Sequence, residues 1–276
     1  MIRLAEPGEV HEKRDHTRIG GSKAGHCRME IWLDAHGHEP EPFPEQARRT
    51  VEIGVAVETL MFNGLTFVED DGTKRTIGRW WDSLGVLKDP ISGNKLDPSD
   101  WILSDYQREV DVDGWKGHID AIGHWKTPLV NRAVLIDCKT TQGYGYERVL
   151  KGQDLLKDPF MREYVYQMNF YMEGLRRAGV PVEEAILLFF NKEKSNCVYR
   201  TIAYSPDLVT EALERLSWAN SGAEPVPDWD WPDKAVLPLR CRYCSQRVNC
   251  AGMRGMVLTE FHNREGTLMV KAERGI

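Results

Sequence analysis

The sequence of 276 residues predicts a mixed α/β fold, in which a sheet is flanked by helices. Two long segments, 44–64 and about 160–178, carry apolar residues at helical spacing. Three short segments of β type lie between them, and two more follow the second helix. This order of helix, three strands, helix and two strands indicates a sheet covered by helices.

The first helix is predicted to begin at Pro44 and to end near Gly64, and Glu58 lies within it. Its apolar residues at roughly helical spacing are Ala47, Val51, Val55 and Leu60. The following segment, about 70–100, contains many Gly, Asp and Pro residues around Trp80, Trp81 and Leu84. We expect an irregular insertion there, either a loop or a lid.

Three short strands are predicted at 106–112, 117–122 and 133–137. The first two are separated by Asp113-Gly114, a pair of residues that favours the tight turn of a β-hairpin. The segment is therefore predicted to form an antiparallel meander.

The second long helix, about 160–178, is predicted to stop at Gly179 and Pro181. Apolar strands are expected after it at 185–190 and 198–204. The two strands that follow this helix are expected to join the same sheet as the three strands before it.

A third helix is predicted from the N-cap Ser205 and the first-turn Pro206 to about Asn220. A linker rich in Pro, Trp and Asp then covers 223–238 and precedes a cysteine-rich tail. The predicted division of the chain is an N-terminal segment at 1–43, a core at 44–222, and a linker with the cysteine-rich segment at 223–276.

The composition allows an enzyme, because 41% of the residues are apolar and can build a core. The start of the chain is charged and does not resemble a signal peptide, and the run Ile186–Phe190 is too short to span a bilayer. We therefore expect a cytoplasmic protein without membrane association. The net charge of -6 argues against a nucleic-acid binder. That objection weakens if several carboxylates surround a cation, because the ion reverses the local charge.

Asp137 and Lys139 are two residues apart on the third predicted strand, so both side chains point to the same face. Asp120 lies on the preceding predicted strand, and neighbouring strands are about 4.8 Å apart. The two aspartates are then close enough to share one Mg²⁺ or Mn²⁺, ions that prefer carboxylate oxygens. Hydrolysis of a phosphodiester is the natural use of such an ion.

Lys139 would either orient the attacking water or stabilise the negative charge of the transition state. Action as a general base would require a lowered pKa. The alternative is an ordinary ion pair between Asp137 and Lys139, which an isolated D-x-K favours by roughly ten to one. The D-x-K motif therefore supports a catalytic site only in combination with the other candidate residues.

Gln167 and Tyr171 are four residues apart on the second long helix, and they form adjacent polar groups on one face. Such a pair is able to contact a DNA strand, although by itself it would be assigned to packing. Tyr164, Tyr166 and Phe170 are expected in the core rather than as base-stacking residues.

Cys241, Cys244 and Cys250 form C-x2-C-x5-C, a spacing that gathers three thiolates around one centre. Cys27 is the best fourth ligand, because the other two cysteines lie on predicted strands, where a buried free thiol is ordinary. Four thiolates fit either an iron–sulfur cluster or a structural zinc. The two chain ends are then expected to meet.

Together these features resemble the RecB-like branch of the PD-(D/E)XK nucleases, including CRISPR-associated and phage-encoded members that carry an iron–sulfur cluster. The resemblance covers nearly the whole chain. Its motifs are G-x-x-D at Gly117–Asp120, D-x-K at Asp137–Lys139 and Q-x-x-x-Y at Gln167–Tyr171. Their order is more specific than any one of them. The resemblance implies a restriction-endonuclease-like mixed sheet flanked by helices, with a small iron–sulfur subdomain formed by both chain ends.

The resemblance also implies a role for each residue that matches a motif. Asp120 and Asp137 would be metal ligands, the Cys138 carbonyl a further ligand and Lys139 the catalytic lysine, with Gln167 and Tyr171 near the substrate. Cys27, Cys241, Cys244 and Cys250 would hold a 4Fe-4S cluster in preference to zinc, because the family also takes one cysteine from before the core and three from after it.

The chain departs from the family at one position. Many relatives have a histidine on the first helix as a metal ligand, whereas Glu58 stands at the matching place, four residues after Gly54. The competing residue is Glu52, which lies roughly 120° away around the helix, so both cannot face the strands. We expect Glu58 to be the ligand.

The expected activity is that of a metal-dependent exonuclease acting on DNA single strands or free ends, in replication, recombination, repair or CRISPR-type processing. The chain has no phosphate-binding loop of the G-x-x-x-x-G-K-[ST] type, so a helicase would have to be a separate partner. A recombinase or integrase-type protein is another expected partner, in a bacterial, archaeal or virus-infected cell.

Two other readings stay open. The chain would be a DNA-binding or adaptor module that does not cut, within a recombination or spacer-acquisition complex, or it would process RNA. The presence of every catalytic residue type argues against a module that does not cut.

Overall fold

The computed structural model describes most of the chain. The described residues are 3–4, 19–42, 45–62, 65–68, 74–77, 87–88, 95–96, 101–125, 133–158, 160–228, 231, 236–264 and 268–275. Among these residues, no helix combines the length and the apolar character that a membrane span requires.

A five-stranded mixed sheet forms the centre, in the order β12-β11-β10-β9-β6. Its strands are β6 (Trp101–Ser104), β9 (Ala121–Trp125), β10 (Ala133–Thr141), β11 (Val182–Asn191) and β12 (Cys197–Ala203). Strands β10 and β11 are parallel, and the other neighbours are antiparallel. The predicted mixed α/β fold, with a sheet flanked by helices, is confirmed.

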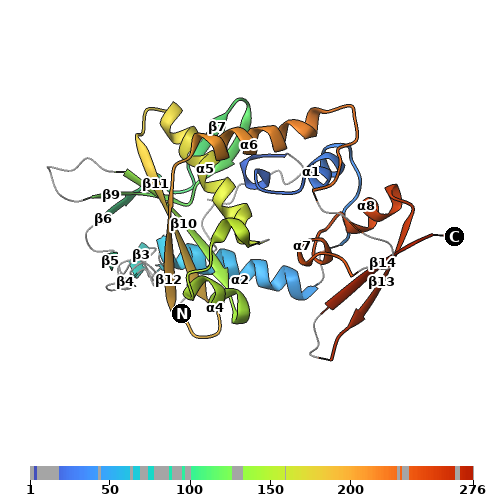
Figure 1. Cartoon of the computed structure of the whole chain (residues 1–276). Helices are drawn as coiled ribbons and strands as arrows, with labels where there is room; N and C mark the ends of the chain where they lie inside the picture. Colours follow the sequence, from blue (N-terminus) through green and yellow to red (C-terminus); the bar gives the residue numbers. More distant parts are fainter. Residues whose placement is uncertain are drawn as a thin grey trace.

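Helices cover both faces of this sheet (Figure 1). They are α2 (Glu45–Phe62), α4 (Gly143–Leu150), α5 (Met161–Arg177) and α6 (Pro206–Ser217). Leu135 and Leu187 pack in the core cluster that contains α5, whereas Ile136 and Leu188 pack in the cluster that contains the end of α2. Side chains alternate between the two faces of β10 and β11, so each strand contributes to both clusters.

The first predicted helix matches α2, but two of the apolar residues that predicted it are exposed. Val51 and Val55 are 54% and 39% exposed, whereas Val57 and Met61 are buried in the core. Gly54 faces β10, and a Cβ there would lie 3.2 Å from Thr140 Oγ1. The helix therefore turns Gly54, rather than Val51 and Val55, towards the strand, which a pattern of apolar residues does not show.

The predicted meander is only partly correct. Strands β7 (Glu109–Val112) and β8 (Trp115–His118) form a hairpin of their own, outside the central sheet. Asp113 and Gly114 have φ values of 55° and 86°, as the predicted tight turn requires. The predicted strand 117–122 is interrupted at Ile119 and Asp120, because the chain leaves the hairpin there and enters the sheet as β9.

The segment between β10 and β11 forms the connection that parallel strands need. The predicted helix 160–178 is confirmed as α5, and the Asp158 carboxylate accepts hydrogen bonds at its start from the Phe160 and Met161 N–H groups, at 2.9 and 3.0 Å. Helix α4 was not predicted. The strands expected at 185–190 and 198–204 are β11 and β12.

Helix α6 begins as predicted, with Pro206 in the first turn and the Ser205 side chain accepting a hydrogen bond from the Leu208 N–H at 3.5 Å. It ends at Ser217 and is followed by a short 3-10 helix, η4 (Trp218–Asn220).

Small strands lie around the predicted insertion. They are β1 (Arg3–Leu4), β2 (Leu65–Val68), β3 (Lys74–Ile77), β4 (Leu87–Lys88) and β5 (Lys95–Leu96), of which the first three form one sheet and the last two form another. Trp80, Trp81 and Leu84 lie outside the described residues.

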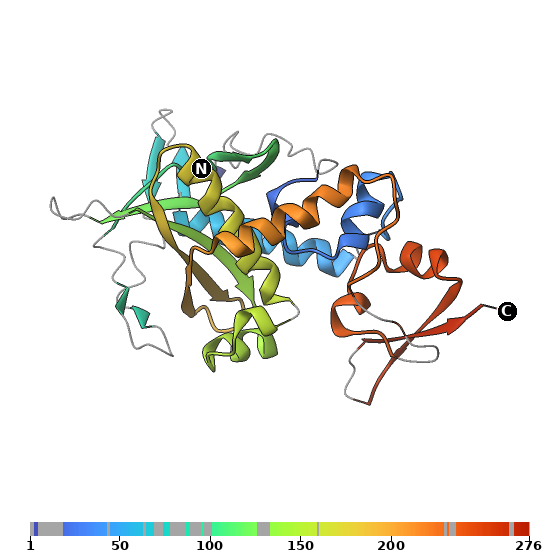
Figure 2. The ribbon, with the colours of Figure 1, turned by 45° about the horizontal axis from the view of Figure 1, so that its top comes forward.

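Segments from both ends of the chain pack together in a third core cluster, away from the sheet (Figures 1 and 2). Its elements are α1 (Arg28–Ala35), α7 (Leu239–Arg242), α8 (Arg247–Met253) and the hairpin β13 (Met256–His262) and β14 (Leu268–Arg274). The short 3-10 helix η1 (Gly21–Lys23), which precedes α1, packs against α5 instead. Met29 and Leu33 of α1 contact this cluster together with Trp231 and Val270. The boundaries at 43/44 and 222/223 stay a prediction.

Candidate metal centre and cysteine pocket

Asp120 and Asp137 lie side by side at the point where β9 begins. The last residue pair of β9 and β10 is Ala121 with Ile136, so the next residue outward on each side is an aspartate. The Cys138 N–H donates a hydrogen bond to Asp120 Oδ2 at 2.8 Å. The expectation that Asp120 lies in the middle of a strand is wrong, because it occupies the bend before β9. The two aspartates are nevertheless neighbours.

Asp137 and Lys139 share one face of β10, as the period of the strand predicts. Lys139 Nζ lies 2.6 Å from Asp137 Oδ1, and the Asp137 side chain is only 2% exposed. Neither carboxylate oxygen of Asp137 accepts a hydrogen bond of good geometry from the described residues. The Lys139 ammonium is therefore the charged group that compensates this buried carboxylate.

Glu58 supplies a third carboxylate from α2. Gln107 Nε2 donates to its Oε1 at 2.5 Å. The pKa of Asp120 is raised well above its ordinary value by burial and by the nearby Asp137 and Glu58 carboxylates, against the opposing effect of Lys139. Three carboxylates of the same charge therefore share one buried region, and a divalent cation would relieve their repulsion.

Glu52, the competing residue on α2, faces solvent. Its side chain is 68% exposed and lies 3.9 Å from the Arg48 guanidinium. Of the two glutamates, the structure brings Glu58 to the aspartates, in agreement with the helical angle between them.

Lys139 holds its proton strongly. Burial lowers the pKa of this amine, but Asp137 and Asp120 outweigh burial, and the net shift is upward. The Nζ atom also lies 5.2 Å from the centre of the Tyr164 ring, which favours a cation. Of the three roles considered for Lys139, action as a general base has the least support, and stabilisation of negative charge has the most.

Gln167 and Tyr171 form a pair on α5, in which Gln167 Nε2 donates to Tyr171 Oη at 2.8 Å. Tyr171 is only 3% exposed. Burial raises the pKa of its phenol to about 12, and the phenol also interacts with Lys139, Asp137 and Asp120. The pair therefore borders the carboxylate site, and Gln167 is its more exposed member.

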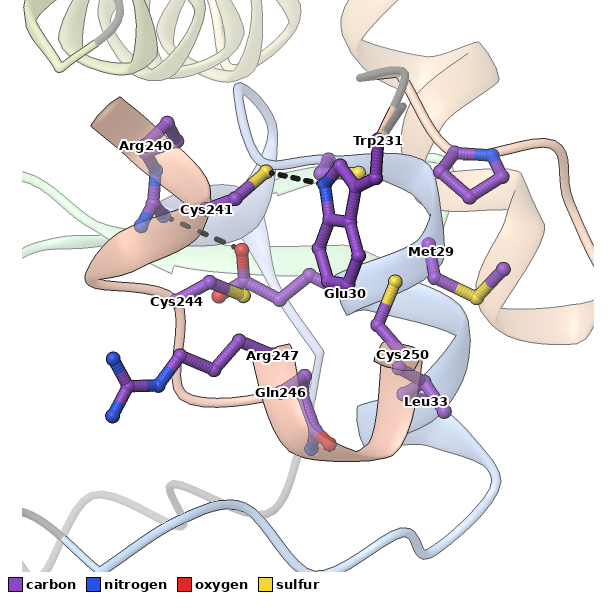
Figure 3. Close-up of a pocket in the computed structure, with 12 residues that line it drawn as sticks. Met29, Glu30, Leu33, Trp231, Arg240, Cys241, Cys244, Gln246, Arg247 and Cys250 are labelled. Atoms are coloured by element: carbon purple, nitrogen blue, oxygen red, sulfur yellow. Dashed lines mark hydrogen bonds and ion pairs between the residues drawn. The ribbon is translucent and has the colours of Figure 1, made fainter. Parts of the chain in front are cut away.

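All four cysteines expected to act together line one cavity of about 20 Å³ (Figure 3). They are Cys27, Cys241, Cys244 and Cys250. Trp231 Nε1 donates a hydrogen bond to Cys241 Sγ at 3.3 Å, and the figure shows these two groups facing each other. Cys138 and Cys197 belong to a different cluster, beside the sheet.

The cysteine pocket consists of these four thiols and the side chains around them. Burial raises the pKa of Cys241 to about 11 and that of Cys250 to about 12, and it raises the pKa values of Cys27 and Cys244 as well. These groups are therefore thiols at neutral pH unless a cation stabilises the thiolates. The cavity itself holds about one water-sized sphere, so its volume does not choose between zinc and a cluster.

Neither site has the geometry of a finished metal centre. Within the described part of the chain, no three or more His, Cys, Asp or Glu side chains are arranged to hold a metal ion. Three of the candidate ligands accept hydrogen bonds: Asp120 from the Cys138 N–H, Glu58 from Gln107, and Cys241 from Trp231.

Several residues in these sites were not predicted. Gln107 bonds to Glu58, Tyr164 lies beside Lys139, and Trp231 bonds to Cys241. Only Trp231 had a local signal, because it belongs to the tryptophan-rich linker close to the cysteines. The other two depend on contacts between distant segments.

No family model and no curated protein matches this sequence. Among solved structures, the protein SSO0001 is similar, with 14% identity, a TM-score of 0.43, and coverage of 84% of this chain and 85% of that chain. An alkaline exonuclease from Laribacter hongkongensis has 10% identity and a TM-score of 0.41, with 74% and 86% covered.

A phage-related exonuclease from Haemophilus somnus has 13% identity and a TM-score of 0.32, with 73% of this chain and 91% of that chain covered. Likeness at this level decides nothing about activity. The function has to be inferred from the site itself.

Proposed function

We propose that this chain is a metal-dependent DNA nuclease, an exonuclease that hydrolyses phosphodiester bonds. One observation carries the proposal: the Glu58, Asp120 and Asp137 carboxylates lie close enough to affect one another's charge, and Lys139, 2.6 Å from Asp137 Oδ1, is the cation beside them. Three carboxylates with one ammonium leave an excess of negative charge, which a divalent cation would compensate.

The three carboxylates suit Mg²⁺ or Mn²⁺, which prefer oxygen ligands and retain several waters. When bound, such an ion supplies an activated water and neutralises charge on a phosphoryl group. Asp120, Asp137 and Glu58 would hold it, with the Cys138 carbonyl as a proposed further ligand. Gln107 orients Glu58 for this role through its 2.5 Å hydrogen bond.

The remaining residues act on the substrate. Lys139 keeps its proton, so its ammonium stabilises the negative charge that develops on the phosphoryl oxygens. Gln167, hydrogen-bonded to Tyr171 Oη, would contact the DNA backbone beside the carboxylates. Tyr171 is buried and acts by fixing Gln167.

The proposed cofactor of the cysteine pocket is a 4Fe-4S cluster, with zinc as the alternative. Four cysteine thiols on one cavity form a suitable donor set for either. The indole N–H beside Cys241 stabilises a thiolate, which fits a metal-bound sulfur. Its proposed role is structural, since the pocket joins the two chain ends. Protein purified without oxygen should be brown and contain iron. Zinc without iron in this protein would refute the assignment of an iron–sulfur cluster.

The activity is tested with end-labelled single- and double-stranded DNA in Mg²⁺ or Mn²⁺, where shortened products are expected. Lys139→Ala should reduce cleavage by about 1,000-fold while the protein stays folded and binds DNA. Lys151→Ala is the matched control, because Lys151 is an exposed lysine just after α4. Full activity of Lys139→Ala would refute the assignment. DNA binding without cleavage in the wild type would favour a module that does not cut.

A further inference from the structure

Both chain segments that carry the cysteines contact α5 at one residue, Glu163. The Arg240 guanidinium, directly before Cys241, forms an ion pair and a hydrogen bond with the Glu163 carboxylate. His26, directly before Cys27, places its Nε2 3.6 Å from Glu163 Oε2. Two segments far apart in the sequence therefore meet at the same side chain.

The backbone makes a third contact at this place. A Cβ on Gly25 would lie only 2.5 Å from Glu163 Cα and 2.9 Å from its carbonyl oxygen. The chain just before Cys27 is thus packed directly on the first turn of α5, with no room for a side chain. The contact between the cysteine-bearing segment and α5 is tight.

Arg240 also links Glu163 to α1. It lies 3.3 Å from Glu30 Oε2, a contact drawn as a dashed line in Figure 3. Glu30 is 4% exposed and contacts His26 Nδ1 at 3.0 Å and Lys23 Nζ at 3.3 Å. Both Glu30 and Arg240 line the cysteine pocket. A buried charge network therefore connects the pocket wall to α5.

The first turn of α5, which contains Glu163, also borders the carboxylate site. Tyr164, next to Glu163, lies beside the Lys139 ammonium. Gln167 is one helical turn after Glu163 and holds Tyr171. A shift in the first turn of α5 would therefore move the groups around Lys139, and small displacements in an active site cost large factors in rate.

We infer that Glu163 is a positioning residue through which the metal-loaded cysteine pocket fixes α5, and thereby sets the rate of the nuclease site. The inference rests on the proposed nuclease function for its effect on rate. Loading the pocket ties Cys27 to Cys241, which holds His26 and Arg240 on Glu163. Loss of the metal frees both segments, and α5 loses its anchor.

The test is hydrogen–deuterium exchange of the full-length protein at amides 161–171. Wild-type protein purified without oxygen is compared with the same protein after its iron is removed by ferricyanide and EDTA, or its zinc by EDTA. Stripping should speed exchange in the first turns of α5 by about ten-fold. In Arg240→Gln, exchange should already be fast, and stripping should add little.

Arg242→Gln is the matched control. Arg242 belongs to the same short helix and flanks the same cysteine, but its Nε donates to the Leu237 carbonyl at 2.8 Å. This variant should respond to stripping as the wild type does. In activity assays with loaded protein, Arg240→Gln should lower kcat about ten-fold with little change in KM, and Arg240→Lys should restore part of the loss.

Equal exchange of α5 in loaded and stripped wild type would overturn the inference, and so would identical behaviour of Arg240→Gln and Arg242→Gln. Protein without iron or zinc in the pocket would overturn it too. Failure of the nuclease proposal has a different signature, in which the wild type cuts no DNA although α5 still responds to stripping.

Discussion

The ring of Tyr171 lies directly on the backbone of Gly117. A Cβ at position 117 would be 2.4 Å from Tyr171 Cε1, closer than side-chain atoms approach one another. This contact joins the glycine of G-x-x-D to the tyrosine of Q-x-x-x-Y, and so it sets β8 against α5. Asp120 follows three residues later, at the entrance to β9.

Gly117→Ala is expected to destabilise the protein by about 1–3 kcal/mol, because the new methyl group has to displace a buried ring. Urea unfolding followed by circular dichroism measures the change. Gly222→Ala is the control, since nothing lies within 4 Å of a Cβ at that position. Equal stability of the two variants would show that the Tyr171 ring moves away without cost.

Metal binding should stabilise the protein. The effect should be visible in the pH dependence of stability that the Asp120 carboxylate causes. Its raised pKa means that the folded state binds a proton more tightly than the unfolded state does. Without metal, the contribution of Asp120 to stability is therefore greatest in acid, and it falls as the pH rises from about 4 through the folded pKa. Mn²⁺ should remove this decline, because it compensates the carboxylates.

The variant Asp120→Asn tests whether repulsion among these carboxylates destabilises the metal-free protein. The neutral amide should raise the melting temperature of metal-free protein at pH 7, and it should abolish both the response to Mn²⁺ and DNA cleavage. Melting curves across pH, with EDTA or with Mn²⁺, measure these effects. A lower melting temperature for the variant in EDTA would contradict a crowded carboxylate site.

Glu58→Gln should reduce cleavage by about 100-fold and raise the Mn²⁺ concentration needed for half-maximal activity, because one charged ligand is lost. Glu52→Gln, on the same helix but facing solvent, should behave as the wild type. Rates over a series of Mn²⁺ concentrations measure both effects. The reverse pattern would make Glu52 the ligand.

Glu30→Gln should destabilise the protein at pH 7 by about 2 kcal/mol, because it removes a buried carboxylate from Lys23 and Arg240. These two cations keep Asp34 and Glu163 as charged partners. Burial raises the pKa of Glu30, but His26, Lys23 and Arg240 together hold it well below its ordinary value. Its contribution is therefore present above the unfolded pKa and is lost as the pH falls.

The acid limb of the stability curve should accordingly be shallower in Glu30→Gln than in the wild type. Glu183→Gln is the control, because Glu183 is 76% exposed in its ion pair with Arg176 and should change stability little. An unchanged acid limb in Glu30→Gln would mean that the buried network does not depend on this charge.

Local patterns in the sequence predicted much of this fold. The period of two along β10 placed Asp137 and Lys139 on one face, and the boundaries of α5 and the start of α6 follow from capping and apolar spacing. The spacing of Cys241, Cys244 and Cys250 likewise predicted that these thiols lie together. Each of these features depends on residues close in the chain.

Other features depend on how distant segments pack. Asp120 reaches Asp137 from a bend rather than from within a strand, because β8 pairs with β7 and leaves the chain to turn before β9. Val51 and Val55 of α2 are exposed because Gly54 allows the helix to approach β10 on its other side. Neither the position of Asp120 nor the orientation of α2 can be predicted from a local sequence pattern.

The sequence by itself determined which residue types are available for chemistry, which of them share a face of one strand or helix, and the order in which they follow. Only the tertiary structure decided that Gln107 holds Glu58, that Tyr171 is buried over Gly117, and that Glu163 joins the cysteine pocket to α5. The reason is physical: periodicity is a property of neighbouring residues, whereas burial and ion pairing arise only when remote segments exclude water from each other.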